Sequence, residues 1–170
     1  MTTKFIYERK IKIMKLTFAP RGIIQIDDAR IMYKNLSGKP SQYNRAGDRD
    51  FSVVIPNEEL ADQLVDAGWN VKVKEFEDGG KLMYLKVKVK FNDRGPVIYL
   101  KSGMNQIRLD EETVGQIDYM DIASVDMDIR PYDWEIRGDV GRTAYLSAMR
   151  VTQNVDRFAT RFAEEEFPRD

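Results

Sequence analysis

Strict alternation of apolar and charged residues near the middle of the chain is the feature that most constrains its fold. The stretch from Leu82 to Phe91 reads Leu-Met-Tyr-Leu-Lys-Val-Lys-Val-Lys-Phe. Successive side chains of a β-strand point to opposite faces, so this stretch predicts a strand with one apolar and one cationic face. The predicted apolar face consists of Leu85, Val87, Val89 and Phe91, and the cationic face of Tyr84, Lys86, Lys88 and Lys90.

A second stretch, from Asn70 to Phe76, repeats the alternation and places Lys72 and Lys74 between apolar residues. Like charges on one face of a sheet weaken it unless something anionic lies across them. Two adjacent strands of this kind would form a cationic surface on which single-stranded nucleic acid is held through its phosphates and bases. The ordinary alternative is a solvated face whose lysines provide solubility and protect an edge. The presence of two such strands favours the first interpretation.

The residue types that the chain lacks exclude most enzyme classes. The 170 residues include neither cysteine nor histidine. Thiolate zinc sites, catalytic triads with Cys or His, and the usual side chain for proton transfer at neutral pH are therefore excluded. We expect one main domain, no catalytic activity, and no cofactor or metal. No apolar run approaches the roughly 18 residues of a membrane-spanning helix, so we expect a soluble, cytoplasmic protein that does not associate with membranes.

Charge is distributed unevenly along the chain. Residues 1–101 contain 19 lysines and arginines against 13 acidic residues, whereas residues 102–170 contain 8 against 15. The formal net charge of −1 hides this difference. Because a local cluster of cations can attract a polyanion whatever the net charge, the first hundred residues are the expected location of a binding surface.

The remaining patterns predict a mainly β protein, an OB-like antiparallel β-barrel with two short helices and a C-terminal helix or tail. Asn57 is a helix N-cap before an apolar stripe that ends at Gly68, and a second short helix starts at Asp110. Two short helices cannot cover both faces of a parallel sheet, which favours a small barrel. The predicted strands span 22–36, 49–55, 70–76, 82–91, 97–101, 122–130 and 145–153, and residues 131–142 form a hairpin arm. The predicted domains are a basic N-terminal arm or extra strand (1–22), the barrel (23–153), and a C-terminal helix or acidic tail (154–170).

Five short sequences resemble the OB-fold single-stranded DNA-binding proteins of tailed bacteriophages and prophages over residues 23–151. They are Lys-Asn-Leu-Ser-Gly-Lys-Pro (34–40), Tyr-Asn-Arg-Ala-Gly-Asp-Arg-Asp-Phe-Ser-Val-Val-Ile (43–55), Gly-Trp-Asn-Val-Lys (68–72), Leu-Asp-Glu-Glu-Thr-Val-Gly (109–115) and Arg-Pro-Tyr-Asp-Trp-Glu (130–135). The resemblance implies a barrel that coats and protects single-stranded DNA (ssDNA) with little sequence preference during phage replication or recombination. Residues 1–22 do not fit that family.

The candidate DNA-binding residues come from the two lysine stretches, the polar loop 37–48 and the hairpin arm. For the loop, the alternative is a hydrogen-bonded, solvated connector. Tyr132 and Trp134 either stack on bases or pack beneath the hairpin, and Trp69 has the parity of a core residue. The complete candidate set is Lys39, Tyr43, Arg45, Arg49, Lys72, Lys74, Tyr84, Lys86, Lys88, Lys90, Tyr132, Trp134, Arg137 and Arg142.

Two other function classes remain open from the sequence. Asp126 and Asp128 form an Asp-x-Asp pair on one strand face, a spacing that can bind Mg²⁺ in a nuclease or recombination enzyme. No third carboxylate or lysine follows at a convincing catalytic spacing. The other alternative is a barrel that serves structural protein interactions.

The two ends carry separate expectations. The alternation from Lys10 to Leu16 could add an edge strand, reach a second subunit in a homo-oligomer, or belong to a basic arm. The apolar stripe of Val155, Phe158 and Phe162 precedes three glutamates. It predicts either a docked helix or a mobile acidic tail that competes with DNA and recruits replication or recombination proteins.

The tail hypothesis makes a direct prediction. Deleting the residues after Thr160 removes Glu164, Glu165 and Glu166, which would otherwise compete with phosphate for the lysines. We expect ssDNA to bind several-fold more tightly at low salt and almost unchanged at high salt, as measured by fluorescence titration. Unchanged affinity together with a lower melting temperature would instead identify a docked helix.

Overall fold

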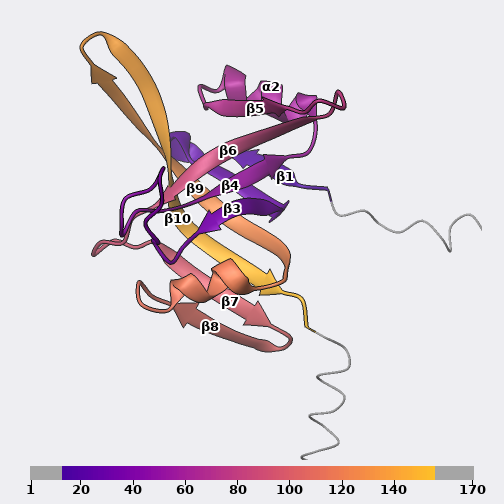
Figure 1. Cartoon of the computed structure of the whole chain (residues 1–170), viewed down its shortest axis with the longest axis vertical. Helices are drawn as coiled ribbons and strands as arrows, with labels where there is room; N and C mark the ends of the chain where they lie inside the picture. Colours follow the sequence, from indigo (N-terminus) through magenta and orange to yellow (C-terminus); the bar gives the residue numbers. More distant parts are fainter. Residues whose placement is uncertain (1–12, 156–170) are drawn as a thin grey trace, which may run out of the picture.

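The computed structural model describes residues 13–155, and ten strands in this part of the chain form one strongly bent sheet (Figure 1). The expected mainly β class is confirmed. The strands are β1 (Lys15–Phe18), β2 (Ile24–Ala29), β3 (Ile31–Asn35), β4 (Arg49–Ile55), β5 (Val71–Glu75), β6 (Lys81–Val89), β7 (Val97–Ser102), β8 (Asn105–Leu109), β9 (Ile122–Ile136) and β10 (Asp139–Gln153). The helices are η1 (Pro20–Gly22), α2 (Glu58–Asp66) and η2 (Val114–Tyr119), and η1 and η2 are 3₁₀ helices.

The strand order gives an OB-like arrangement. The hydrogen-bonded path runs β1-β2-β9-β10-β6-β4-β3. Only Arg30 separates β2 from β3, and its carbonyl accepts the backbone N–H of Val54 at 2.9 Å. Residues 24–35 therefore act as one bent strand that pairs first with β9 and then with β4, as in the partly open barrel of an OB fold. This is the strand with a bulge expected for residues 22–36, divided in two at Arg30.

Two strand pairs are parallel, which the alternation patterns did not predict. β6 pairs with β10 at Val87 and Lys88, and β7 continues in the same direction along the rest of β10. The bent strand, β9, β10, β6 and β4 follow one another in hydrogen-bonded order, and we call these five strands the ring because the bent strand pairs with both β9 and β4. Because directions cannot alternate all the way around a ring with an odd number of members, one pair has to be parallel.

The predicted strand faces agree with the burial of the side chains. Leu85, Val87 and Val89 are buried, whereas Lys86 and Lys88 are exposed. Phe91 lies beyond the end of β6 and packs partly against the core. Trp69 is only 4% exposed, which confirms its place in the core, and the alternating residues Phe51, Val53 and Ile55 of the predicted strand β4 are buried.

The two lysine strands are neighbours, as predicted, although the core does not reach the far end of β5. β5 pairs antiparallel with β6 and with no other strand in the described part of the chain. Its first residue, Val71, packs partly against the core, but Val73 is 55% exposed and not inward-facing as expected. Val73 belongs to a strand that pairs on one side only within the described residues, and the buried residues of the neighbouring α2 are Ala61 and Leu64.

Helix α2 and the hairpin arm begin, turn and end at the residues that favour those positions. The Asn57 side chain accepts the Leu60 N–H at 2.9 Å, and the chain leaves the helix through Gly68 with φ of +97°. β9 and β10 form the predicted arm, which projects from the body at the end opposite the β7–β8 hairpin (Figure 1). Its tip, Arg137 and Gly138, has positive φ at both residues, as a type I′ turn requires.

Two strands were not predicted as such, and the ends of the chain fall outside the description. β1 pairs with β2 within the expected N-terminal arm or extra strand, and β8 shows no alternation because only Leu109 is buried. The proposed arm before Ile13 and the helix or tail after Val155 lie outside the described residues and stay predictions. No helix within residues 13–155 is long and apolar enough to span a membrane.

Core packing yields the first structural prediction. Phe51 is fully buried in the middle of β4, so Phe51→Ala would leave a large cavity. We expect a loss of about 3 to 5 kcal/mol in the free energy of unfolding, measured by urea denaturation. Ile129→Val removes one methylene from another fully buried site and should cost only about 0.5 to 1.5 kcal/mol. Equal effects at the two positions would contradict this description of the core.

Candidate nucleic-acid interface

Three neighbouring strands present cations and aromatic rings on the same face of the sheet. Lys88 on β6 is the register partner of Tyr145 on β10, and Tyr145 is the register partner of Arg130 on β9. Register partners on adjacent strands point to the same side, and so do residues two positions apart on one strand. We call this surface the cationic face, and its members are Tyr84, Lys86, Lys88, Arg130, Tyr132 and Tyr145.

Aromatic contacts organise the part of the cationic face that lies on β9 and β10. The Arg130 guanidinium lies 4.8 Å from the centre of the Tyr145 ring. Tyr132 meets Tyr145 edge to face, with ring centres 6.1 Å apart. Tyr132 is more than half exposed, so a ring remains accessible for stacking. Arg130 and Tyr145 are not among the predicted binding residues, although their buried neighbours Ile129 and Leu146 show that both point outward.

A hollow of about 520 Å³ lies beside the lysines of β6, between this strand and the loop that joins β3 to β4. We call it the loop hollow. It brings together residues from Tyr43 to Tyr145 of the sequence, and six of them are predicted binding residues. These are Tyr43, Arg45, Arg49, Lys86, Lys88 and Lys90.

Some of the cations in the loop hollow form ion pairs with carboxylates of the protein. Lys86 Nζ lies 3.7 Å from Asp50, and Arg45 lies 3.3 Å from Asp48. Lys88 and Lys90 are exposed and form no ion pair with any residue among 13–155. Their ammonium groups are therefore the ones most available to an incoming anion.

Arg49 lines the same hollow but uses most of its donors within the protein. Its side chain is only 16% exposed, and Nε donates to the Leu36 carbonyl at 3.0 Å. Its guanidinium pairs with Glu111 at 3.4 Å and lies 5.5 Å from the centre of the Phe91 ring. These contacts indicate that Arg49 supports the loop, which is the alternative that the sequence left open.

The base of the loop is fixed by η2. The Asp118 carboxylate accepts the backbone N–H groups of Leu36 and Ser37, at 2.7 and 3.0 Å, and the Ser37 hydroxyl at 2.6 Å. Lys39 donates to the Tyr119 hydroxyl and lies over its ring. By contrast, Tyr43 at the far end of the loop is 91% exposed. The loop therefore presents a free aromatic ring from an anchored base.

The remaining predicted lysines extend the surface along β5. Lys72 is the register partner of Tyr84, so it lies on the side of the cationic face. Lys74 Nζ is 5.7 Å from the centre of the Phe76 ring, closer to the β5–β6 turn. The structure therefore places Lys72 beside the face and Lys74 toward its margin.

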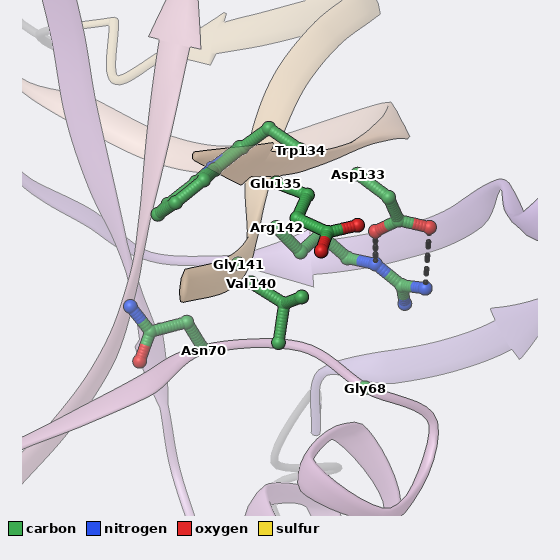
Figure 2. A pocket seen from close by; sticks show the side chains of 8 residues that line it. All are labelled: Gly68, Asn70, Asp133, Trp134, Glu135, Val140, Gly141 and Arg142. Carbon is green, nitrogen blue, oxygen red and sulfur yellow. Dashed lines mark hydrogen bonds and ion pairs between the residues drawn. The ribbon is translucent and has the colours of Figure 1, made fainter. Parts of the chain in front are cut away.

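In the arm, the predicted binding residue Arg142 makes several contacts within the protein. It forms a two-pronged ion pair with Asp133, at 2.6 and 3.1 Å (Figure 2). Its guanidinium donates to the Ala67 carbonyl at 2.8 Å. It also lies over the buried Trp69 ring. These contacts join the arm to the end of α2, and they lower the pKa of Asp133 through hydrogen bonding and charge. Arg137 stays at the exposed tip.

Trp134 covers the glycine opposite it. Its register partner is Gly141, where any Cβ would overlap the indole ring. A second hollow, of about 850 Å³, lies between this part of the arm and the chain at Gly68 and Asn70 (Figure 2). The partly buried ring thus has a packing role and also lines an open space, so the two sequence interpretations are compatible.

The two aspartates considered for Mg²⁺ binding have local roles. Asp126 accepts the backbone N–H of Asp28 at 3.0 Å and pairs with Arg150 at 2.8 Å. Burial raises the pKa of Asp128, and the charge of Asp27 acts in the same direction. Within residues 13–155, no three acidic side chains are grouped so that they could hold a metal ion.

Comparisons with known proteins agree with this geometry. The family model described as putative phage ssDNA-binding domain matches residues 15–169. The structure of a C-terminally truncated single-stranded DNA-binding protein from bacteriophage Enc34 superposes with a TM-score of 0.55, at 12% identity over 85% of this chain and 93% of that chain. The same phage protein in complex with ssDNA gives a TM-score of 0.55, at 14% identity over 85% and 94% of the two chains. These likenesses establish a shared fold. No curated protein sequence matches the chain.

Replacing Asp126 or Asp128 by asparagine should change the melting temperature of the protein in opposite directions. The raised pKa of Asp128 means that ionisation disfavours the folded state, so Asp128→Asn should raise the melting temperature at pH 7. The gain should shrink as the pH falls through the raised pKa of the folded protein and vanish below the ordinary pKa of a carboxyl group. Asp126→Asn is the matched control and should lower the melting temperature, because it disrupts the ion pair with Arg150. A lower melting temperature for both variants at pH 7 would contradict the assignment for Asp128.

Proposed function

The chain belongs to the family of putative phage ssDNA-binding domains, and from this membership we propose that it binds ssDNA across the cationic face and the loop hollow. The observation that carries the proposal is the alignment of Lys88, Tyr145 and Arg130 on three adjacent strands. This alignment brings ammonium, guanidinium and aromatic groups side by side, and proteins use that combination to hold single strands.

The two kinds of group have separate tasks. Lys88 and Lys90 are unpaired within the described residues and would bind phosphates first. Lys86 would exchange its contact with Asp50 for a phosphate, at the cost of a weak, partly exposed ion pair. Bases would stack on Tyr43, Tyr84, Tyr132 and Tyr145, each stacked base contributing on the order of 1 to 3 kcal/mol. Trp134 and Arg137 would extend the path along the arm.

This arrangement supports binding with little sequence preference. Ammonium groups recognise the phosphate backbone, and every base offers an aromatic face. A duplex hides its base faces by stacking, so it would meet only the cations. Arg49 and Arg142 would act indirectly, by positioning the loop and the arm.

The biological role that fits these properties is to coat and protect ssDNA during phage DNA replication or recombination, in the cytoplasm of the host cell. Neither a catalytic step nor a cofactor is required for that role. We further propose that the acidic C-terminal tail recruits replication or recombination proteins, and that self-association into a homo-oligomer would extend the coated length.

The proposal is tested by titrating labelled oligo(dT), oligo(rU) and duplex DNA at several salt concentrations. Neutralising roughly four to seven phosphates should give a log–log slope of about −3 to −5 for ssDNA, with much weaker binding to duplex. Replacing Lys88 and Lys90 together by alanine should reduce the magnitude of that slope by about 1.4, because two phosphate contacts are lost.

Lys101→Ala is the matched control. Lys101 is an exposed lysine on β7, outside the loop hollow and the cationic face. Its removal changes the net charge without removing a proposed contact, so the slope should stay near that of the wild type. A slope that does not depend on Lys88 and Lys90, or binding that is insensitive to salt, would exclude the proposed surface.

A further inference from the structure

Tyr33 has a backbone conformation that its residue type disfavours. It lies within β3 with φ of +52°, in the left-handed region that Gly and Asn enter far more readily than an aromatic residue. The pairing of β3 with β4 shifts register between Met32 and Asn35, so Tyr33 sits in a bulge. Bulges of this kind redirect a side chain.

The bulge is held firmly on both sides. Before it, Met32 remains in register with Ser52. After it, Lys34 donates to the Met120 carbonyl at 3.3 Å. The Asn35 side chain accepts the Lys39 N–H at 2.9 Å and donates to the Lys39 carbonyl at 3.0 Å. A disfavoured conformation persists only where its surroundings impose it, as they do here.

The bulge directs the Tyr33 ring toward Tyr84 of the cationic face. The two ring centres are 5.9 Å apart, and the planes meet at 74°. β4 lies between the two strands, and its Val54 is the register partner of Tyr84. Tyr33 therefore reaches across one strand to join the face. The side chain is still 51% exposed, so packing alone does not account for its position.

Tyr33 adds a second pair of tyrosines to the cationic face. Tyr33 and Tyr84 form one edge-to-face pair, and Tyr145, the register partner of Lys88, forms the other with Tyr132. The distance along β6 from Tyr84 to Lys88 is about 13 Å, given the rise of a β-strand. A DNA strand with one base stacked at Tyr84 and another at Tyr145, beside Lys88, would therefore have a short run of phosphates between the two bases.

We propose that Tyr33 is a nucleobase-stacking residue that extends the ssDNA path beyond Tyr84, an inference that rests on the proposed function. The disfavoured backbone is maintained because it aims an exposed ring at the path. Lys72, the register partner of Tyr84 on β5, lies on the opposite side of Tyr84 from Tyr33 and would bind a phosphate there.

The test uses substitutions that suit the backbone but remove the ring. Tyr33→Gly and Tyr33→Asn should weaken oligo(dT) binding by about 5- to 150-fold, the effect of losing one stacked base. The salt slope should not change, because no charge is lost. The melting temperature should stay the same or rise, because both residues adopt positive φ readily. Tyr33→Phe keeps the ring and should bind like the wild type.

Tyr99→Ala is the control, an exposed tyrosine on β7 away from the face, and it should leave affinity unchanged. Binding is measured by fluorescence anisotropy well below the melting transition of each variant. Wild-type affinity in both the Gly and Asn variants would overturn the inference while leaving the proposed function intact, and so would a Phe variant as weak as Gly. A wild-type protein that fails to bind oligo(dT) would overturn the proposed function itself.

Discussion

The short parallel contact between β6 and β10 is the constraint on which the candidate site depends. It spans only Val87 with Ala144 and Lys88 with Tyr145. A ring of five strands requires one parallel pair, and here that pair joins the lysine strand to the strand that carries the arm. Val87 and Ala144 are both buried, so this contact is fixed from the core side. A shift by one residue would turn Lys88 inward and bury its charge, which is strongly unfavourable.

Internal carboxylates make a dense cationic surface compatible with a stable fold. Asp50 lies on the strand next to β6, opposite Lys88 and in an ion pair with Lys86. It lessens the repulsion between lysines of the same face, and Asp48 does the same for Arg45. Such exposed pairs are weak, so phosphate can displace them. At the proposed site, the same pairs that stabilise the free protein would therefore keep DNA binding reversible and dependent on salt.

The sequence predicted the features that are local and failed at those that depend on contacts between distant segments. Alternation gave the two faces of β6, the buried Trp69 and the inward side of β4, because side-chain direction in a strand depends only on parity. It could not align Arg130 with Lys88, because register between strands is set by the whole ring. The contacts of Arg49 and Arg142 could not be predicted either, because they also join distant segments. The carbonyl of Leu36 engages Arg49 and that of Ala67 engages Arg142, and no sequence pattern marks a carbonyl as an acceptor.

The site combines a rigid platform with two projecting elements whose bases are anchored. The platform is the cationic face, where residues belong to paired strands. The loop carries the exposed Tyr43 but is fixed at its base by Asp118, and the arm carries the exposed Tyr132 but is fixed at its root by Arg142. Anchoring reduces the conformational entropy that a ligand would otherwise have to remove on binding. The exposed side chains remain free to adjust to different bases. This division explains how a protein can hold ssDNA firmly through its backbone while reading little of its sequence.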